Sequence, residues 1–206
     1  MFTIIDLGIS NITSVANAFS KIGSKTNVTR DKSVVSQAKA LVLPGVGAYQ
    51  GGMSLLDKAG LTDVIRDRVL NKGVSILGIC LGMQLLANQS SEHGIHKGLG
   101  LLPGVVEKLE SKDQKYRVPN IGWSITSPKK RGVLFDSLAT EESYYYVHSY
   151  HFVCENSEDV ASTIDYSQRS VTVAVERDNI FGVQFHPEKS QDPGLNLLHR
   201  YASKWG

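Results

Sequence analysis

The sequence has few cysteines, no excess of either charge and no long hydrophobic run. Its 206 residues include 2 Cys, which allow one disulfide at most, so the chain is not a disulfide-rich secreted scaffold. The most apolar stretch, residues 74–87, is interrupted by Ser75 and Gln84 and is shorter than the roughly 20 residues that cross a bilayer. Residues 1–10 contain no Lys or Arg. We therefore expect no secretory signal, no membrane association and a cytoplasmic location.

The balance of charges excludes a broad basic surface. Lys and Arg total 22 against 20 Asp and Glu, a formal charge of +2, and there is no long basic run. Nucleic acid is therefore not an expected partner. The hydrophobic content of 41% is that of a globular chain, and we find no repeat, low-complexity tract or linker. The sequence predicts a single domain over residues 1–206.

The first half of the chain alternates between strand and helix patterns. Residues 2–6 form a short apolar run, followed by a helical face that ends near Gly23. The alternation repeats with a strand at 40–43, a helical stretch around 61–69 and a strand at 74–77. This pattern predicts an α/β fold with a central, mostly parallel sheet flanked by helices. In such sheets ligands bind beyond the carboxyl ends of the strands.

The second half is rich in β patterns. Strand-like runs cover residues 117–126, 144–154, 160–166 and 171–185, the last with a turn at 177–179. Asp192 followed by Pro193 predicts a helix with Asp192 as N-cap and proline at the first helical position. We expect a β-rich portion added to the sheet and a final helix that closes the domain.

Residues 78–82 (Gly-Ile-Cys-Leu-Gly) lie between a predicted strand and a predicted helix. This is the spacing of a nucleophile elbow, with Cys80 in the place of the usual serine. The glycines leave room for a sharp turn, and the helix N-terminus behind the thiol favours the thiolate. By itself the segment fits a small buried hydrophobic cysteine better than a nucleophile, so a nearby base is needed to change that interpretation.

Residues 186–188 (His-Pro-Glu) supply such a base. They follow an apolar strand, and side chains two apart on extended backbone point the same way. The His186 imidazole can then take the Cys80 proton, and Glu188 can accept a hydrogen bond from the other ring nitrogen. Acyl transfer also needs donors for an oxyanion. Backbone N–H groups of Val46 and Gly47, after another strand, and of Leu81 are the candidates.

Two of these segments resemble the class I (triad) glutamine amidotransferases, whose motifs are Gly-x-Cys-x-Gly-x-Gln and His-Pro-Glu. Both are complete, at residues 78–84 and 186–188. With residues 44–47 (Pro-Gly-Val-Gly) and 147–150 (Val-His-Ser-Tyr), they are most similar to the glutaminase subunits of imidazole glycerol phosphate synthases. The resemblance extends from the first strand to the last helix and implies the fold of that family.

The resemblance implies glutamine hydrolysis through a γ-glutamyl thioester on Cys80, without a metal or other cofactor. It implies that His186 is the acid/base and Glu188 its orienter, and that the 44–47 segment forms the oxyanion hole when the partner's acceptor is bound. L-glutamine would be held by Gly47, Gln84, Ser149 and Tyr150. The implied partner is a (β/α)₈-barrel cyclase in a heterodimer for histidine biosynthesis, and the implied interface includes Asn11, Asn120 and Trp123.

The sequence departs from the family pattern near that implied interface. The family usually has Asp-Tyr-Gly-x-Gly-Asn where residues 6–11 read Asp-Leu-Gly-Ile-Ser-Asn, and Pro-His-x-Gly-Trp-Asn where residues 119–124 read Pro-Asn-Ile-Gly-Trp-Ser. These differences leave open a paralogous synthase as partner, for example one that makes an amidino sugar. An unrelated cysteine hydrolase and a non-catalytic binding module are further alternatives, disfavoured by Gln84 and by the complete triad.

The remaining His, Glu and Cys residues that could bind a metal or react are given no functional role. Glu92, His93 and His96 have a spacing that could suit a metal, but Gly94 and two adjacent serines predict a mobile loop. Cys154 is expected to pack as a small hydrophobic residue.

Overall fold

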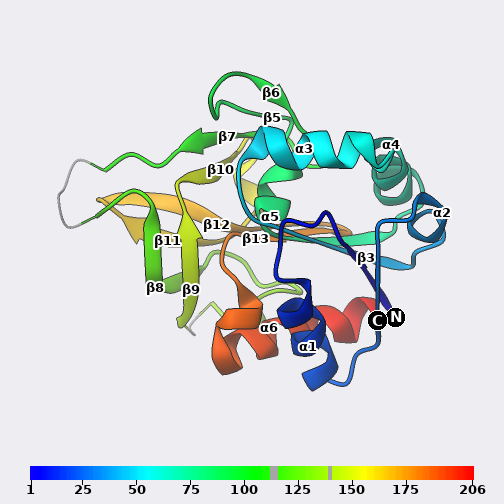
Figure 1. Ribbon diagram of the computed structural model, residues 1–206. Coiled ribbons are helices and arrows are strands. Elements are labelled where there is room, and N and C mark those ends of the chain that lie inside the picture. The colour runs from blue at the N-terminus through cyan, green and yellow to red at the C-terminus, as the bar shows by residue number, and fades with distance from the viewer. Residues whose placement is uncertain (112–115, 139–140) are drawn as a thin grey trace.

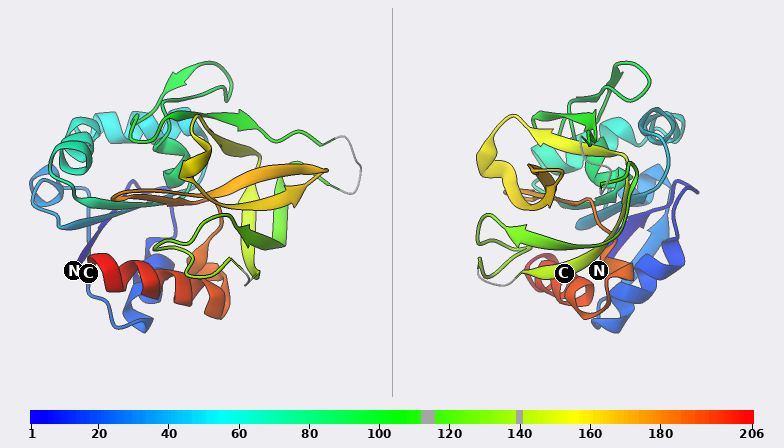
Figure 2. Two further views of the ribbon diagram at one scale, coloured as in Figure 1. Left: turned by 180° about the vertical axis from the view of Figure 1, so that it is seen from behind. Right: turned by 90° about the vertical axis from the view of Figure 1, so that its left-hand side faces the viewer.

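A computed structural model describes residues 1–111, 116–138 and 141–206. Figures 1 and 2 show a large sheet with helices on both faces and a smaller sheet to one side, and the two chain termini lie side by side. This confirms the predicted α/β class. Within the described residues, no helix combines the length and apolarity needed to cross a bilayer.

The large sheet has nine strands and is half parallel. Its first five strands pair in parallel, and the following four are antiparallel to their neighbours. In this sheet, the parallel strands come from the first half of the sequence, together with β13, the last strand of the chain. The strands in spatial order are β2 (Thr26–Thr29), β1 (Phe2–Ile5), β3 (Ala40–Gly45), β4 (Ser75–Cys80), β13 (Ile180–Val183), β12 (Arg169–Arg177), β11 (Val160–Tyr166), β8 (Asn120–Pro128) and β9 (Glu142–His148).

Two hydrophobic clusters hold the helices against the sheet. One contains Phe19 of α1 and Tyr201 of α6, and the other contains Leu56 of α3 and Leu85 of α5. Figure 1 shows these two pairs of helices on opposite faces. The helices are α1 (Ile12–Lys21), α2 (Lys32–Val35), α3 (Tyr49–Lys58), α4 (Thr62–Arg66) with the π-helical turn η1 (Asp67–Asn71), α5 (Leu81–Leu85), the 3₁₀ turns η2 (Ser157–Asp159) and η3 (Pro187–Lys189), and α6 (Gln191–Trp205).

The predicted strand over residues 144–154 is two strands in different sheets. It is interrupted at Ser149, where the chain leaves β9 of the large sheet and enters β10 of the small one. The change of sheet brings residues 147–150 to the junction between the sheets. The small sheet contains, in spatial order, β10 (Tyr150–Cys154), β7 (Gly104–Lys108), β5 (Gln89–Ser90) and β6 (His96–Lys97).

The start of the last helix was predicted wrongly. Ser190 is the N-cap of α6, so Asp192 lies inside the first turn and Pro193 is the third helical residue. Proline is tolerated there because the N–H groups of the first turn have no acceptor within the helix. Residues 117–119 likewise precede β8 and do not belong to it.

Candidate active site

The backbone turns sharply at Cys80, between the end of β4 and the start of α5. Cys80 has φ 55° and ψ −112°, a conformation that costs on the order of 1–3 kcal/mol for a residue with a side chain. The turn brings α5 against the neighbouring strand: a Cβ atom on Gly82 would lie 1.7 Å from the Leu43 carbonyl oxygen. A Cβ on Gly78 would lie 2.6 Å from the Gly82 carbonyl oxygen. Glycine on both sides therefore permits the strained conformation at Cys80.

The contact at Gly82 gives a stability prediction. Gly82→Ala is expected to lower the free energy of unfolding by more than about 4 kcal/mol, because backbone on both sides must shift. Gly51→Ala is the matched control: Gly51 is an exposed α3 residue with open space around it, and we expect a gain of about 0.5–1 kcal/mol. Urea unfolding measures both, and a loss at Gly82 below 1 kcal/mol would contradict the close approach.

His186 and Glu188 face each other after β13. Nδ1 of His186 lies 2.8 Å from Oε1 of Glu188, and each side chain is 4% exposed. The Ser190 hydroxyl donates to the His186 carbonyl oxygen at 2.6 Å and accepts from the Tyr145 N–H at 3.0 Å, which ties this segment to β9. Nε2 of His186 is buried and accepts or donates no hydrogen bond among the described residues. That nitrogen is the one available for proton exchange with Cys80.

The surroundings of His186 favour the imidazolium form. Burial lowers the pKa of His186, but its interactions with the Cys80 side chain and the Glu188 carboxylate outweigh burial and raise the pKa to about 9. The imidazole is therefore protonated at neutral pH. In that form it can give a proton to a leaving amine.

This raised pKa predicts how stability depends on pH. Because the pKa rises from 6.5 to about 9 on folding, the contribution is complete below pH 6.5 and is lost as the pH rises through 9. The unfolding free energy of the wild type, minus that of His186→Asn, should fall by about 3 kcal/mol between pH 6 and pH 10. His199→Asn, at an exposed position of α6, is the control and should show no such trend. A flat His186 difference curve would contradict the assignment.

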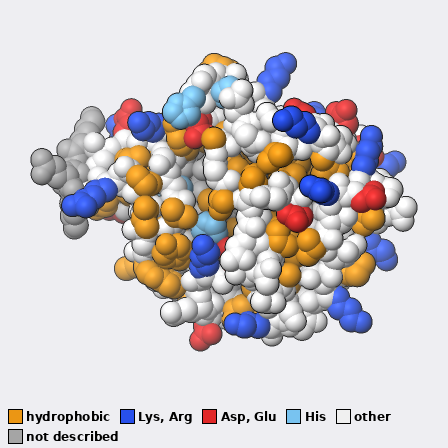
Figure 3. All heavy atoms as spheres, viewed as in Figure 1, with side chains coloured by type: hydrophobic (Ala, Val, Ile, Leu, Met, Phe, Trp, Pro, Cys, Tyr) orange, Lys and Arg blue, Asp and Glu red, His pale blue; other side chains and the backbone are white. Residues whose placement is uncertain are grey.

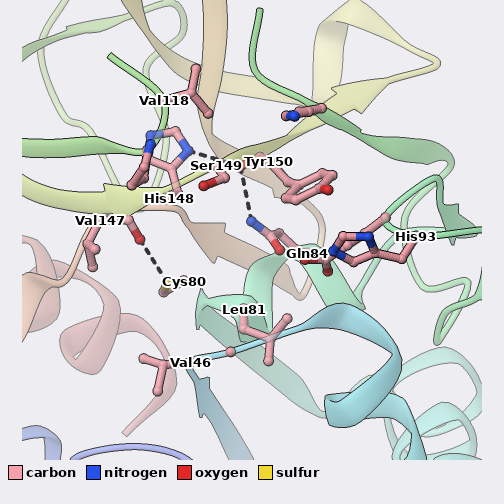
Figure 4. A pocket seen from close by; sticks show the side chains of 14 residues that line it. Val46, Cys80, Leu81, Gln84, His93, Val118, Val147, His148, Ser149 and Tyr150 are labelled. Atoms are coloured by element: carbon pink, nitrogen blue, oxygen red, sulfur yellow. Dashed lines mark hydrogen bonds between the residues drawn. The ribbon is translucent and has the colours of Figure 1, made fainter.

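Cys80 opens onto a cavity of about 610 Å³ where the two sheets meet (Figure 4). The size is typical of small-molecule sites. The Cys80 sulfur lies 3.9 Å from the Val147 carbonyl oxygen and 3.7 Å from Nε2 of Gln184. His186 and Glu188 do not line the cavity. Its lining residues are Val46, Gly47, Cys80, Leu81, Gln84, Glu92, His93, Lys108, Val118, Pro119, Val147, His148, Ser149 and Tyr150.

The residues expected to bind substrate all line this cavity, namely Gly47, Gln84, Ser149 and Tyr150. Of the expected oxyanion donors, Val46 has its N–H bonded to the Ile9 carbonyl oxygen at 3.0 Å, so this N–H is occupied. Gly47 has φ 105°, which glycine adopts without strain. Leu81 is the first residue of α5, where an N–H has no acceptor within the helix.

The residues expected at a partner interface lie outside the cavity lining. Asn11 caps α1, its side chain accepting from the Ser14 N–H at 3.1 Å, and is exposed. Trp123 of β8 is 49% exposed. Asn120 of β8 turns its amide towards the cavity wall, where Nδ2 lies 3.0 Å from Nε2 of His148.

Sequence reasoning missed part of the cavity wall. Glu92 and His93 lie in a loop, as predicted, but this loop joins β5 to β6 beside the cavity, and Oε2 of Glu92 accepts from the Tyr49 N–H at 2.6 Å. The pairing of β5 with β7 positions this loop, and the sequence around residues 89–97 has no clear strand pattern. Lys108 and His148 were also not singled out. In the described ranges no cluster of His, Cys, Asp or Glu could hold a metal ion.

Comparison with known proteins identifies the class. The family model for glutamine amidotransferase class-I matches residues 3–202, and the chain belongs to this family. Its fold is also that of PurLQS from Thermotoga maritima, with a TM-score of 0.76 at 16% identity over 100% of this chain and 98% of that one.

Curated relatives narrow the family further. The chain is 42% identical to the imidazole glycerol phosphate synthase subunit HisH of Salinibacter ruber, covering 98% of this chain and 94% of that protein. It is 40% identical to the imidazole glycerol phosphate synthase subunit HisH 2 of Methanococcus maripaludis, over 98% of both. Within the class I glutamine amidotransferases, the chain belongs with the HisH subunits.

Proposed function

We propose that this chain is the glutaminase subunit of an imidazole glycerol phosphate synthase, a single glutamine amidotransferase domain over residues 1–206. The observation that carries the proposal is the elbow cysteine at the floor of a cavity, with the buried His186–Glu188 pair behind it. The similarity to HisH subunits along 98% of the chain supports the choice of synthase. The chemistry below uses no metal or other cofactor.

The reaction proceeds by two acyl transfers. The Cys80 sulfur attacks the side-chain amide carbon of L-glutamine, and a C–S bond forms. His186 gives a proton to the amide nitrogen, the C–N bond breaks, and ammonia leaves a γ-glutamyl thioester on Cys80. Water then attacks the thioester carbonyl, His186 takes the proton from water, and the C–S bond breaks to release glutamate. Because the thiol must stay reduced, a reducing compartment such as the cytoplasm suits this mechanism.

Charges in the cavity suit a zwitterionic amino acid. Glu92 provides a carboxylate for the α-ammonium group, and Lys108 provides an ammonium for the α-carboxylate. The Gln84 amide nitrogen donates hydrogen bonds to the Tyr150 carbonyl oxygen at 3.1 Å and to Oε1 of Gln184 at 2.9 Å. Its own Oε1 is therefore the atom that can accept a hydrogen bond from the substrate amide. Ser149 and Tyr150 complete the wall.

A cyclase subunit with a (β/α)₈ barrel is the proposed partner in a heterodimer, in which ammonia passes directly to the acceptor site. An exposed apolar strip on β8 supports a docking face: Ile121 is 62%, Trp123 49% and Ile125 62% exposed. Figure 3 shows hydrophobic side chains gathered over β8 and β9. Val46, 41% exposed, adds to the exposed apolar side chains of the site. Neither nucleic acid nor a membrane is part of this assembly.

The hydrogen bond between the Val46 N–H and the Ile9 carbonyl gives a reason why glutamine hydrolysis would depend on binding of the partner. While that bond exists, the N–H cannot stabilise an oxyanion, and loss of one such donor costs about 10²–10³ in rate. This N–H lies in the peptide between Gly45 and Val46, so rotation of that peptide would free the donor, and Gly45 can accept new backbone angles with little strain. Binding of partner and acceptor would drive that rotation.

Glutamate release tests the proposal in three mixtures: this chain alone, with the cyclase subunit, and with cyclase plus its acceptor N'-phosphoribulosyl-formimino-AICAR. We expect at least a hundredfold stimulation in the third mixture, together with formation of imidazole glycerol phosphate and AICAR. Full activity of the isolated chain would contradict the coupling. No glutamate in any mixture would contradict the glutaminase assignment.

A second acceptor synthase is favoured by one observation. Asn120 stands where the family usually has histidine, and its amide is committed to His148. If an amidino-sugar synthase, and not the cyclase, stimulated glutamate release, the glutaminase mechanism would stand and the chain would be assigned to amidino-sugar synthesis.

A further inference from the structure

A chain of hydrogen-bonded side chains leads from the outer strand β8 to the nucleophile. It begins at Asn120, passes through His148, the Tyr150 carbonyl and Gln84, and continues to Gln184, whose Nε2 lies 3.7 Å from the Cys80 sulfur. Gln184 follows β13, is fully buried, and does not line the cavity. It is therefore not placed to touch the substrate. Within the described part of the chain, its amide oxygen accepts from Gln84 and its amide nitrogen donates to the Cys80 sulfur.

The donors and acceptors of this chain fit only one way round. A carbonyl oxygen can only accept, so Nδ1 of His148, 2.9 Å from the Tyr150 oxygen, carries a proton. Burial lowers the pKa of His148 to about 4, so the ring is neutral and its Nε2 accepts from Nδ2 of Asn120. Figure 4 shows His148 and Gln84 reaching the same carbonyl.

The second half starts again at the Tyr150 carbonyl oxygen, which accepts from His148 and from Gln84 independently. Gln84 donates one N–H to the Tyr150 oxygen, which orients its amide nitrogen, and gives its other N–H to Oε1 of Gln184. Gln184 must then present its own N–H groups to the Cys80 sulfur. An N–H donor stabilises a thiolate more than a thiol, because hydrogen bonds to charged groups are the stronger ones. The direction of the Gln184 amide is therefore set by Gln84 and the Tyr150 carbonyl oxygen.

We propose that Gln184 is a positioning residue for the nucleophile: its amide N–H donates to the Cys80 sulfur and favours a negative charge there, and the Tyr150 carbonyl, through Gln84, keeps that amide in the donating orientation. The importance of this role for turnover rests on the proposed glutaminase function. The hydrogen bond itself can be tested without glutamine.

The test is alkylation of Cys80 by iodoacetamide at pH 7 and pH 10, in a Cys154→Ala background so that one thiol remains. In Gln184→Met, which fills similar space without a donor, we expect the rate at pH 7 to fall three- to tenfold and the rate at pH 10 to stay within twofold. A merely structural role would expose Cys80 and raise the rate at both pH values. Other ionisable groups near Cys80 are common to both proteins: His186 and Glu188 behind it, and Glu92, His93, Lys108 and His148 in the cavity.

Two further variants keep the outcome decisive. Ser75→Ala removes another buried hydrogen bond of β4, to the Tyr201 hydroxyl at 2.7 Å, and should leave the ratio of the two rates unchanged. Gln184→Leu, which also lacks a donor, should lower the ratio by a similar factor, and it decides the question if Gln184→Met does not fold. An unchanged ratio in Gln184→Met, or in Gln184→Leu in that case, overturns the proposal. Because no glutamine is present, failure here is distinguishable from failure of the glutaminase assignment.

Discussion

Cys80→Ala is expected to abolish glutamine hydrolysis. The rate should fall by a factor on the order of 10⁶, because a nucleophile and its base act together and the loss of one removes the effect of both. Cys80 is the only thiol in the cavity, and the interaction that raises the pKa of His186 depends on it. Without the sulfur no thioester can form, and His186 has no nucleophile to serve. Glutamate release with the partner and acceptor present measures the effect under the most active conditions.

Cys154→Ala is the matched control for that experiment. Cys154 is a half-buried residue of β10 outside the cavity lining, and burial, with the nearby Asp159 carboxylate, raises its pKa to about 12. It is thus an unreactive thiol at neutral pH, and its replacement should leave turnover within about twofold. Cys80→Ala should also remain folded, which a cooperative urea transition checks. Substantial turnover by a folded Cys80→Ala protein would refute the thioester mechanism.

The predicted fold was most accurate where local pattern and burial agree. The run at residues 160–166 coincides with β11, and the turn at 177–179 joins β12 to β13 as expected. The prediction failed at residues 144–154, because a continuous β pattern does not reveal that the chain changes sheets at Ser149. It also missed the two-residue strands β5 and β6, which are too short to show a β pattern and which join the small sheet through the pairing of β5 with β7.

The site could be anticipated only where its residues are close together in the sequence. The elbow glycines and the two-residue spacing of His186 and Glu188 are local features, and the structure places that pair 2.8 Å apart. Glu92, Lys108 and Gln184 reach the cavity or the sulfur through the packing of distant strands. A buried glutamine beside an apolar strand carries no local signal of such a contact, and the occupied state of the Val46 N–H depends on a bond to another loop.

Glu188→Gln should lower the rate of glutamine hydrolysis by about 10²–10⁴ while leaving Cys80 in place. Oε1 of Glu188 accepts from Nδ1 of His186, and both side chains are almost completely buried. A glutamine side chain has no negative charge to stabilise the imidazolium. It can also turn its NH₂ group towards Nδ1, which would force the wrong tautomer of the ring.

The same substitution has a spectroscopic consequence with a definite sign. The Glu188 carboxylate is one of the groups that raise the pKa of His186 to about 9, so its neutralisation should move the imidazole titration to lower pH, as followed by NMR. Glu110→Gln is the control for charge alone: Glu110 pairs with Arg169 at 2.9 Å on the exposed surface, where such pairs contribute about 0–1 kcal/mol. We expect that variant to keep full activity and an unchanged His186 titration. If Glu188→Gln kept its rate within threefold of the wild type and left the titration in place, Glu188 would have no role in orienting His186, and the buried pair would be structural.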